Sequence, residues 1–562
     1  MHINNDDNEF ASSPSRSNDA GDHAAEFRGS RGNRDQLPSP NCDGLAGFCC
    51  KLTSEEEVLL FLAAFLCHKS YDVNGKLEKS MLRAGSIGPK VAVIGGGFSG
   101  AAIAARLLRS RQVNVDVIEE RPRLGLGLAY GDAQDGQILN VPAGRMSFWA
   151  EQPTHFLDWT KLHGPQLGWP EAQAATVESY LPRRLYGCYV AGVMDAVAKK
   201  ADIKIEGELV HYRTRAIALD QIAGGYRVTL ADGQSIDAAA VVIATGNNLP
   251  APAWPIQGQG SAYIDNPWSE DATADLDPLA PVLVIGTGLT MVDMVLRLNQ
   301  EGHRGRITAI SRHGLLPRPR GETFPSTPAI GVGDTLKGAL HLFTAMRAAI
   351  ARQDGDWRSV IDGLRPTTNT LWQALTLVEK RRFLRHVRPW WDVHRHRMPE
   401  ESAETIYALI AEDRLSVRAA RIDNIKVQGI CAVVSLRPRE TQRQETQAFA
   451  RVINCTPGQS DIARTSNPLL ADMRRKGFLR PDPLGLGADC DEKGALRNRR
   501  GEALEGLFAI GPLLLGTLFE ATAVPDIRLQ ADALARSVGA FLRNASACRT
   551  RNEECRSLEV SL

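Results

Sequence analysis

Two glycine-rich turns have the residue types and spacing best suited to binding a nucleotide. The first reads Gly-Gly-Gly-Phe-Ser-Gly and begins at Gly95. We expect Gly95 to allow a tight turn, Gly97 to let the backbone approach a pyrophosphate, and Gly100 to let a helix lie close to the preceding strand. Ser99 belongs to the same turn, where the N–H groups that open a helix attract phosphate.

An acidic residue follows the next apolar stretch, as a dinucleotide site requires. Glu119 comes directly after the stretch 113–118 and stands about 20 residues beyond the last glycine. A carboxylate there would accept hydrogen bonds from the adenosine ribose hydroxyls. Glu120 is the neighbouring alternative, but the alternation of side chains along a strand favours Glu119. A turn with a purely structural role is the competing interpretation.

The second turn keeps only two of the three glycines, because Met291 stands where the third would be. This loss should move the helix slightly away from the strand without removing the amides that face a phosphate. The strand 307–310 is followed by a hydroxyl and a guanidinium in place of an acid, which suits a 2′-phosphate. NADPH is therefore predicted in preference to NADH, with an ordinary surface arginine as the alternative. The residues expected to face this second cofactor are Gly286, Gly288, Leu289, Thr290, Ser311 and Arg312.

The elements around both turns follow the same order. Strand-like stretches at 90–94 and 282–285 are each followed by a turn, a helix-like run and a further strand, at 113–118 and 307–310. This order is typical of parallel βαβ units, and it predicts an α/β fold. Further strands are expected at 241–246 and 507–510, and mostly helices over 335–388. An amphipathic helix is expected over 526–542.

Bulk properties exclude several classes of protein. A chain of 562 residues predicts about two to four domains. The net charge of +1 offers no electrostatic reason for a nucleic-acid partner. The ten cysteines form no C-x-x-C pair, which favours free thiols in a reducing, cytoplasmic compartment over a dithiol relay. The apolar stretch 57–67 is too short for a transmembrane segment and follows a polar region expected to be disordered, so we expect a short helix or, less favoured, a peripheral membrane contact.

Longer stretches of the chain resemble a known class of proteins. The segments LGLGLAYG, ILNVPAGRMSFW, GTGLTMVD, SRHGLLP, RHVRPWWDVHRHRMP, VINCTPG and LFAIGPLLLGTLFEATAVPDIRLQA lie between residues 124 and 531. Together they are similar to the bacterial, poorly characterised FAD/NAD(P)-binding proteins among the flavoproteins with two dinucleotide-binding domains. The resemblance covers residues 88–540. It implies two Rossmann-like domains, with the FAD domain split in sequence and the NAD(P)H domain inserted.

The resemblance also implies a domain plan and further cofactor contacts. The expected plan is an extension with one short apolar helix at 1–87, the first segment of the FAD domain at 88–280, an NAD(P)H domain with a helical insertion at 281–400, a return segment with the second segment of the FAD domain at 401–545, and a tail at 546–562. Asn140 would line the flavin, and Gly511 would lie at the second FAD-contacting region. Amides near Asp526 and Ile527 would face the flavin pyrimidine edge. The Gly-Asp pair that often holds the ribityl chain is Gly511-Pro512 here, which leaves that contact open.

A dense basic and aromatic cluster spans residues 386–397. The favoured interpretation is a structural corner. The alternative is an anion site for a substrate or nucleotide that includes Arg388 and Trp390, and a metal site is disfavoured for want of an acid pattern. Arg145 is a second candidate for anion recognition near the flavin, and Cys455 is expected to be a packing residue.

These features predict an FAD-dependent oxidoreductase. The favoured hypothesis is a monooxygenase in which NADPH reduces FAD and O₂ adds to form a flavin hydroperoxide that oxygenates a small substrate. The resemblance in plan to N-hydroxylating and Baeyer–Villiger flavoproteins supports it, although the F-x-G-x-x-x-H-x-x-x-W pattern is absent. The alternatives are an NAD(P)H:acceptor reductase without oxygen insertion and a non-catalytic flavin-binding protein. Substrate identity and oligomeric state stay open.

Overall fold

The computed structural model describes residues 88–109, 113–134, 136–202, 207–324, 330–335 and 337–560. The predicted N-terminal extension, with its apolar stretch 57–67, lies outside these residues. Within them, no helix is long and apolar enough to cross a membrane.

The first sheet has six strands and is assembled from both ends of the described chain. Its order is β16 (Ala495–Arg497), β17 (Ala503–Ala509), β7 (Ala240–Ile243), β1 (Lys90–Ile94), β2 (Asn114–Ile118) and β3 (Leu209–Tyr212). From β17 to β3 every neighbouring pair is parallel, and only β16 is antiparallel. Strand β1 is apolar and buried on both faces, which is the pattern of a central parallel strand. Because β17 pairs with β7, the first domain is split in sequence, as predicted.

The second sheet has eight strands that are contributed by the middle of the chain. Its order is β14 (Glu445–Phe449), β13 (Cys431–Pro438), β12 (Leu415–Gln428), β11 (Ile307–Ser311), β10 (Val282–Ile285), β15 (Arg451–Asn454) and β9 (Tyr263–Ile264), with β8 (Ile256–Gln259) paired to β12. The pairs from β12 to β9 are parallel, whereas β12, β13 and β14 form an antiparallel meander. This is the inserted second Rossmann-like domain, and it confirms the predicted fold class.

The limits of this sheet differ from the expected plan. It begins with β8 and β9, before the expected start at residue 281, and it continues through β12 to β15, beyond the expected end at residue 400. The cause is long-range pairing, because Val282 to Ile285 of β10 lie beside Arg451 to Asn454 of β15. Pairing between strands so far apart depends on burial of both faces in the folded domain, which the local pattern does not encode.

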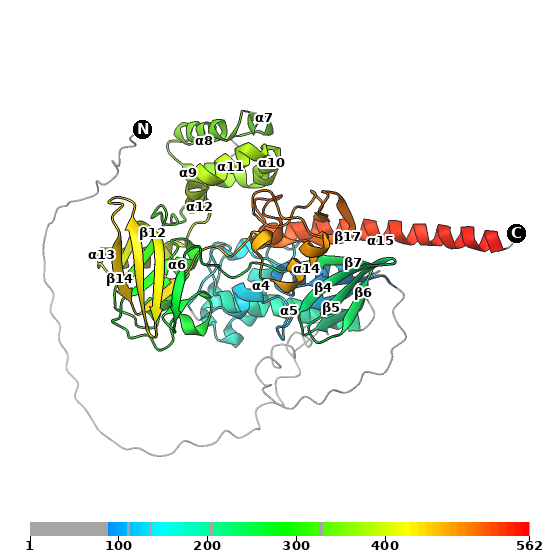
Figure 1. Ribbon diagram of the computed structural model, residues 1–562, viewed down its shortest axis with the longest axis horizontal. Helices are drawn as coiled ribbons and strands as arrows, with labels where there is room; N and C mark the ends of the chain where they lie inside the picture. Colours follow the sequence, from blue (N-terminus) through cyan, green and yellow to red (C-terminus); the bar gives the residue numbers. More distant parts are fainter. Residues whose placement is uncertain are drawn as a thin grey trace, which may run out of the picture. The chain divides into compact units, whose positions relative to one another are not determined.

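Helices cover the sheets and form one separate group. Helix α2 (Phe98–Arg109) and helix α6 (Leu289–Gln300) follow the two turns, and α13 (Glu400–Ala411) packs against α6. A helical group between β11 and α13 matches the helical stretch predicted over 335–388 (Figure 1, green). Its helices are α7 (Val332–Thr335), α8 (Ala339–Arg352), α9 (Trp357–Leu364), α10 (Thr368–Ala374), α11 (Leu377–His386) and α12 (Arg388–Arg395). The last helix, α15 (Val524–Val560), begins earlier and runs further than the predicted 526–542.

Two further elements complete the first domain. Helix α5 (Arg183–Asp202) packs against α2, and its tyrosines Tyr186 and Tyr189 are fully buried beside Phe156. A small antiparallel sheet of β4 (Ala216–Ile222), β5 (Gly225–Leu230) and β6 (Ser235–Ala238) packs on helix α14 (Pro468–Lys476). These elements bury the two faces of the first sheet.

Candidate cofactor and substrate sites

The first glycine turn has the geometry of a dinucleotide site. Gly95 has a φ of +101°, and a Cβ there would lie 2.4 Å from the carbonyl oxygen of Ala244 at the end of β7. A Cβ on Gly100 would lie 1.8 Å from the Gly95 carbonyl oxygen, so that only glycine lets α2 start this close to β1. A Cβ on Gly97 would lie 3.4 Å from the Cα atom of Gly127, which is an ordinary van der Waals distance. Gly95 and Gly100 thus have the close backbone contacts that only glycine allows, and the role of Gly97 toward a pyrophosphate stays a prediction.

Glu119 lies at the edge of this turn and is held there by the backbone. Its Oε2 accepts a hydrogen bond from the Gly96 amide at 2.8 Å, and its Oε1 accepts one from the Arg121 amide at 3.0 Å. Each carboxylate oxygen keeps a further lone pair for a ribose hydroxyl. Glu120 instead forms an exposed ion pair with Arg215 at 2.5 Å. Of the two candidates, Glu119 is therefore the one beside the turn.

The C-terminal region of the chain returns to the first turn. Gly511, with a φ of +78°, lies so close to Ser99 that a Cβ would come within 2.5 Å of the Ser99 Oγ. Its amide donates to the Gln530 side chain of α15 at 3.2 Å. The segment at Gly511, expected as the second FAD-contacting region, thus lies next to the first glycine turn. The two segments are about 400 residues apart in sequence, and the parallel sheet brings them to the same edge.

The amides assigned to the flavin edge are already engaged. Those of Asp526 and Ile527 both donate to the carbonyl oxygen of Ala523, at 3.0 and 2.9 Å. They are therefore not free donors, because α15 begins two residues earlier than expected, at Val524. The Asp526 carboxylate forms an ion pair with Arg365 at 3.3 Å, and burial raises its pKa. A free backbone donor to the flavin from the start of α15 would therefore have to precede Asp526.

The second turn repeats the construction of the first. Gly286 has a φ of +109°, and a Cβ there would lie 2.6 Å from the carbonyl oxygen of Cys455, directly after β15. Around Gly288 the space is open, since a Cβ there would meet nothing within 4 Å. Met291 is fully buried in the core of the second domain, so its side chain fills the space that a third glycine would leave. Leu289 and Thr290 open α6.

A basic surface lies at the end of β11. The Ser311 hydroxyl accepts a hydrogen bond from the Gly314 amide at 2.9 Å and lies 2.9 Å from the Thr287 hydroxyl, whose own proton goes to the Leu315 carbonyl at 2.6 Å. Arg312 is exposed. The pKa of the His313 imidazole is lowered mainly by burial and further by the nearby charges of Arg439 and Arg312. Two guanidinium groups thus stand beside the predicted 2′-phosphate position. Arg439 was missed because it follows β13, far along the chain.

Cys455 is a packing residue rather than a nucleophile. It is buried beside the second turn in the core of the second domain, and burial raises the pKa of its thiol. A thiol with a raised pKa is protonated at neutral pH and unreactive. No group of His, Cys, Asp and Glu in the described region of the chain has the arrangement of a metal site.

The loop expected to line the flavin is held by the second domain. The Arg320 guanidinium donates to the carbonyl oxygen of Asn140 at 3.0 Å. Arg145 of the same loop is exposed and lies near Tyr180. Burial raises the pKa of the Tyr180 phenol, and the charges of Arg320 and Arg145 oppose this rise. The candidate flavin loop and the candidate anion residue therefore lie beside Arg320.

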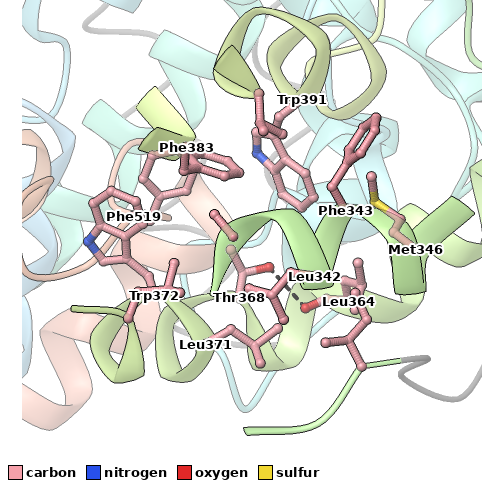
Figure 2. A pocket seen from close by; sticks show the side chains of 14 residues that line it. Leu342, Phe343, Met346, Leu364, Thr368, Leu371, Trp372, Phe383, Trp391 and Phe519 are labelled. Atoms are coloured by element: carbon pink, nitrogen blue, oxygen red, sulfur yellow. Dashed lines mark hydrogen bonds between the residues drawn. The ribbon is translucent and has the colours of Figure 1, made fainter. Parts of the chain in front are cut away.

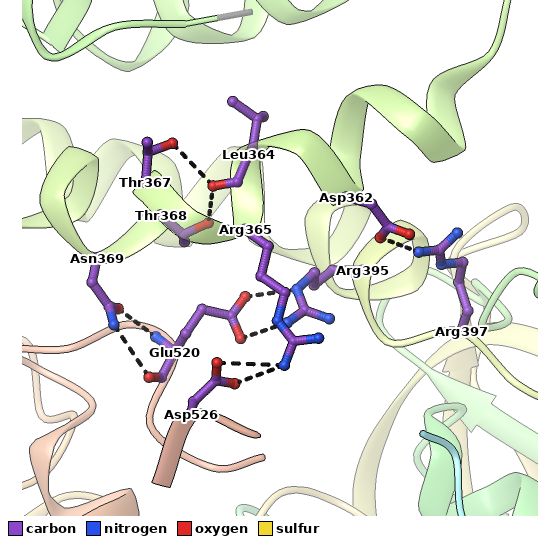
Figure 3. A network of polar contacts seen from close by, with 10 residues as sticks. All are labelled: Asp362, Leu364, Arg365, Thr367, Thr368, Asn369, Arg395, Arg397, Glu520 and Asp526. Carbon is purple, nitrogen blue, oxygen red and sulfur yellow. Dashed lines mark hydrogen bonds and ion pairs between the residues drawn. The ribbon is translucent and has the colours of Figure 1, made fainter. Parts of the chain in front are cut away.

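The predicted basic and aromatic cluster divides into an exposed and a buried group. Trp390 is 47% exposed, and Arg388 forms only an i, i+4 pair with Asp392 at 3.3 Å. Arg395 is buried and pairs with Glu520 at 2.7 Å, and the fully buried Arg397 pairs with Asp362 (Figure 3). Arg395 thus connects the end of α12 to the C-terminal segment, and Arg397 connects the residues after α12 to α9.

An apolar cavity of about 80 Å³ lies in the helical group and against the C-terminal segment. Trp372 stacks on Phe519 at 4.6 Å, and its indole N–H donates to the carbonyl oxygen of Gly516 at 2.9 Å. Figure 2 shows Phe383 beside this stack and Trp391 between Phe383 and Phe343. The cavity is smaller than one that holds benzene, about 150 Å³. Its apolar lining packs the helical group against Phe519 of the C-terminal segment.

Residues 92–248 match a protein family described as FAD-NAD(P)-binding. This region of the chain is an FAD/NAD(P)-binding domain, as both the turn and the sequence resemblance predicted. A protein of Mycobacterium tuberculosis, described as uncharacterized, is 25% identical over 530 residues, which cover 81% of this chain and 96% of that protein. An L-aspartate N-monooxygenase of Streptomyces davaonensis is 24% identical over 292 residues, 41% of this chain and 44% of that protein.

Solved structures show the same fold. The ornithine hydroxylase of Pseudomonas aeruginosa in its reduced form superimposes with a TM-score of 0.55 at 14% identity, covering 81% of this chain and 100% of that one. The L-lysine 6-monooxygenase of Pseudomonas syringae has a TM-score of 0.55 at 16% identity, with 81% and 99% covered. The fold is therefore that of the two-domain FAD/NAD(P)-binding flavoproteins, and the predicted likeness in plan to N-hydroxylating enzymes is confirmed.

Proposed function

We propose that this protein is an FAD-dependent oxidoreductase that uses NADPH and acts as a monooxygenase on a small molecule. The observation that carries the proposal is the repeated turn, with Gly95 against the Ala244 carbonyl and Gly286 against the Cys455 carbonyl. Each turn stands at the carboxyl ends of the parallel strands of its own sheet, where nucleotides bind in such folds. Two such sites in one chain suit a flavin and a nicotinamide dinucleotide.

The residues have separate roles in this proposal. Gly95, Gly97, Ser99, Gly100 and Glu119 would hold the FAD, and Asn140 and Gly511 would adjoin it. The second turn would hold NADPH, with Ser311 and Arg312 on its 2′-phosphate. When bound, the flavin would supply the transfer of two electrons from NADPH to O₂, with one oxygen atom entering the substrate and the other leaving as water. The ornithine, lysine and aspartate monooxygenases that share the fold or some of the sequence support oxygen insertion over simple electron transfer.

The test begins with the purified protein. Extraction should release FAD, and NADPH should reduce the bound flavin faster than NADH does. Mixing the reduced protein with O₂ in a stopped-flow instrument should then show a transient absorbing species before oxidised flavin returns. Direct return to oxidised flavin would favour a reductase that passes electrons to another acceptor. If the protein binds FAD but does not oxidise NADPH with any acceptor that is tested, including O₂, it would be a flavin-binding protein without turnover.

A further inference from the structure

Two arginines beside the candidate flavin loop have hydrogen-bond donors without partners. The side chain of Arg397 is fully buried, yet its Nε and Nη1 atoms have no hydrogen-bond partner among the described residues. The same holds for the Nε atom of Arg320. Buried polar groups in proteins are almost always hydrogen-bonded, and an unpaired buried donor is costly. Three such donors on two neighbouring guanidinium groups point to a ligand that accepts hydrogen bonds.

The charges around these donors lead to the same conclusion. Figure 3 shows three arginines of this region that each have a carboxylate partner, namely Arg365 with Asp526, Arg395 with Glu520 and Arg397 with Asp362. Arg320 forms no ion pair within the described residues, and its bonded Nη2 donates to a backbone carbonyl. Burial lowers the pKa of Arg320 to about 10, so it stays protonated at neutral pH. Asp362, which pairs with Arg397, is the carboxylate whose charge also acts on Arg320, so the two guanidinium groups have one carboxylate between them.

Backbone contacts hold the two arginines next to each other. Residues 318–320 run beside residues 396–398, with a bridge between Pro319 and Met398 and a hydrogen bond from the Arg320 amide to the Met398 carbonyl at 2.9 Å. Arg397 also lies close enough to lower the pKa of Arg320. Both arginines act on the phenol of Tyr180. A pair of guanidinium groups held in this way is prepared for an anion and is not a flexible surface pair.

The location identifies which anion. Arg320 donates to the carbonyl of Asn140, in the loop expected to line the flavin. The phosphates of both dinucleotides are expected at the two glycine turns, and the 2′-phosphate at Arg312 and Arg439. Planar guanidinium groups bind a planar carboxylate through two parallel N–H···O bonds. We propose that Arg320 and Arg397 bind a carboxylate group of the substrate next to the flavin. This inference rests on the proposed function, and it specifies that the substrate is a small carboxylic acid.

The experiment is a titration of the FAD-loaded protein with two simple carboxylates, benzoate and succinate. Their uncharged counterparts, benzamide and succinamide, serve as ligand controls. Binding is followed by the change in flavin absorbance and, separately, by the rise in melting temperature, which needs no flavin. At least one acid should bind about tenfold more tightly than its amide, because charge-assisted hydrogen bonds are roughly twice as strong as neutral ones.

Variants locate the site. Arg320→Gln removes a guanidinium without orphaning a carboxylate and should weaken binding of the acid about tenfold. Arg397→Lys keeps a positive charge beside Asp362 but should also weaken binding of the acid, because an ammonium group lacks the planar pair of N–H donors that matches a carboxylate. Arg227→Gln, which removes one member of an exposed ion pair with Asp237, is the control and should leave binding unchanged. The KM for NADPH should stay the same in all three variants, and binding is compared at equal FAD content.

Several results would overturn the inference. One is equal binding of acids and amides in both readouts, and another is unchanged acid binding in Arg320→Gln. A loss of NADPH affinity in Arg320→Gln with acid binding retained would assign the arginines to the nicotinamide cofactor. Failure of the proposed function is distinguishable, since it would show as absent FAD or absent NADPH oxidation. Acid binding measured by the melting temperature would still decide the role of the arginines in that case.

Discussion

The guanidinium of Arg183 donates to the carboxylate of Asp293 at 2.8 Å, and this ion pair joins helix α5 of the first domain to helix α6 of the second. Both side chains are only 12% exposed. Burial raises the pKa of Asp293, and Arg183 counteracts this shift by stabilising its charge. Because α6 begins at the second glycine turn, the pair connects the candidate NADPH turn directly to the FAD domain.

Loss of this pair should destabilise the protein. Arg183→Ala leaves the Asp293 carboxylate buried without its partner, which costs about 3 kcal/mol. Arg227→Ala is the matched control, because it removes an exposed pair with Asp237 that solvent screens, and it should leave the melting temperature nearly unchanged. Melting temperatures compare the two variants with the unchanged protein. Equal losses would mean that the Arg183–Asp293 pair does not hold the domains together.

The second turn can be tested with two glycine variants that differ in their surroundings. Gly288→Ala adds a methyl group to open space, so the melting temperature should stay the same, while the KM for NADPH rises about tenfold as the backbone is kept from the pyrophosphate. Gly286→Ala forces a positive φ and a contact with the Cys455 carbonyl, so it should lower the melting temperature as well. An unchanged KM in Gly288→Ala would mean that the nicotinamide cofactor binds elsewhere.

Coenzyme preference should depend on the arginines after β11 and β13. Arg312→Glu should lower the ratio of kcat/KM for NADPH to that for NADH by about tenfold or more, because it replaces a charge-assisted bond with repulsion of the 2′-phosphate. Arg439→Ala should shift the ratio in the same direction by a smaller factor. Arg437→Ala, which breaks an exposed pair with Asp423, is the control and should leave the ratio unchanged. If the ratio is the same in all variants, the 2′-phosphate assignment is wrong.

Stability at acid pH should report on the contact between α2 and the flavin loop. Glu151 follows this loop and pairs with Arg106 at 2.6 Å and Arg109 at 2.7 Å, and the hydrogen bond from Arg106 is the main cause that lowers its pKa to about 2. A carboxyl with a lowered folded-state pKa adds stability above its ordinary value of 4.5, and this stability is lost as the pH falls towards 2.

The measurement for Glu151 is the melting temperature as a function of pH. Glu151→Gln should lower it at pH 7 by the equivalent of about 1 kcal/mol or less, because the side chain is 45% exposed and solvent screens the pair. The difference from the unchanged protein should shrink as the pH falls below about 4.5. A difference that stays constant over this range would show that the charge of Glu151 contributes nothing.

Local patterns in the sequence determined much of the cofactor machinery. The first turn, β1, β2, β10 and the helices of 335–388 were predictable because glycine spacing and apolar periodicity act over a few residues. The same holds for the second turn, where the structure shows Met291 filling the place of the missing glycine. The roles of these residues toward FAD and NADPH stay predictions for the experiments above.

The tertiary structure decided which distant segments meet. Residues 415–454 complete the second sheet, and Gly511 lies against Ser99, because buried strands and close backbone contacts select their partners only in the folded core. The roles within the arginine-rich cluster were equally beyond local patterns. Arg395 and Arg397 are two positions apart in the sequence. Arg395 donates two hydrogen bonds to the Glu520 carboxylate, whereas two donor nitrogens of Arg397 have no partner among the described residues. Burial and the arrangement of neighbours, which depend on the whole fold, set that difference.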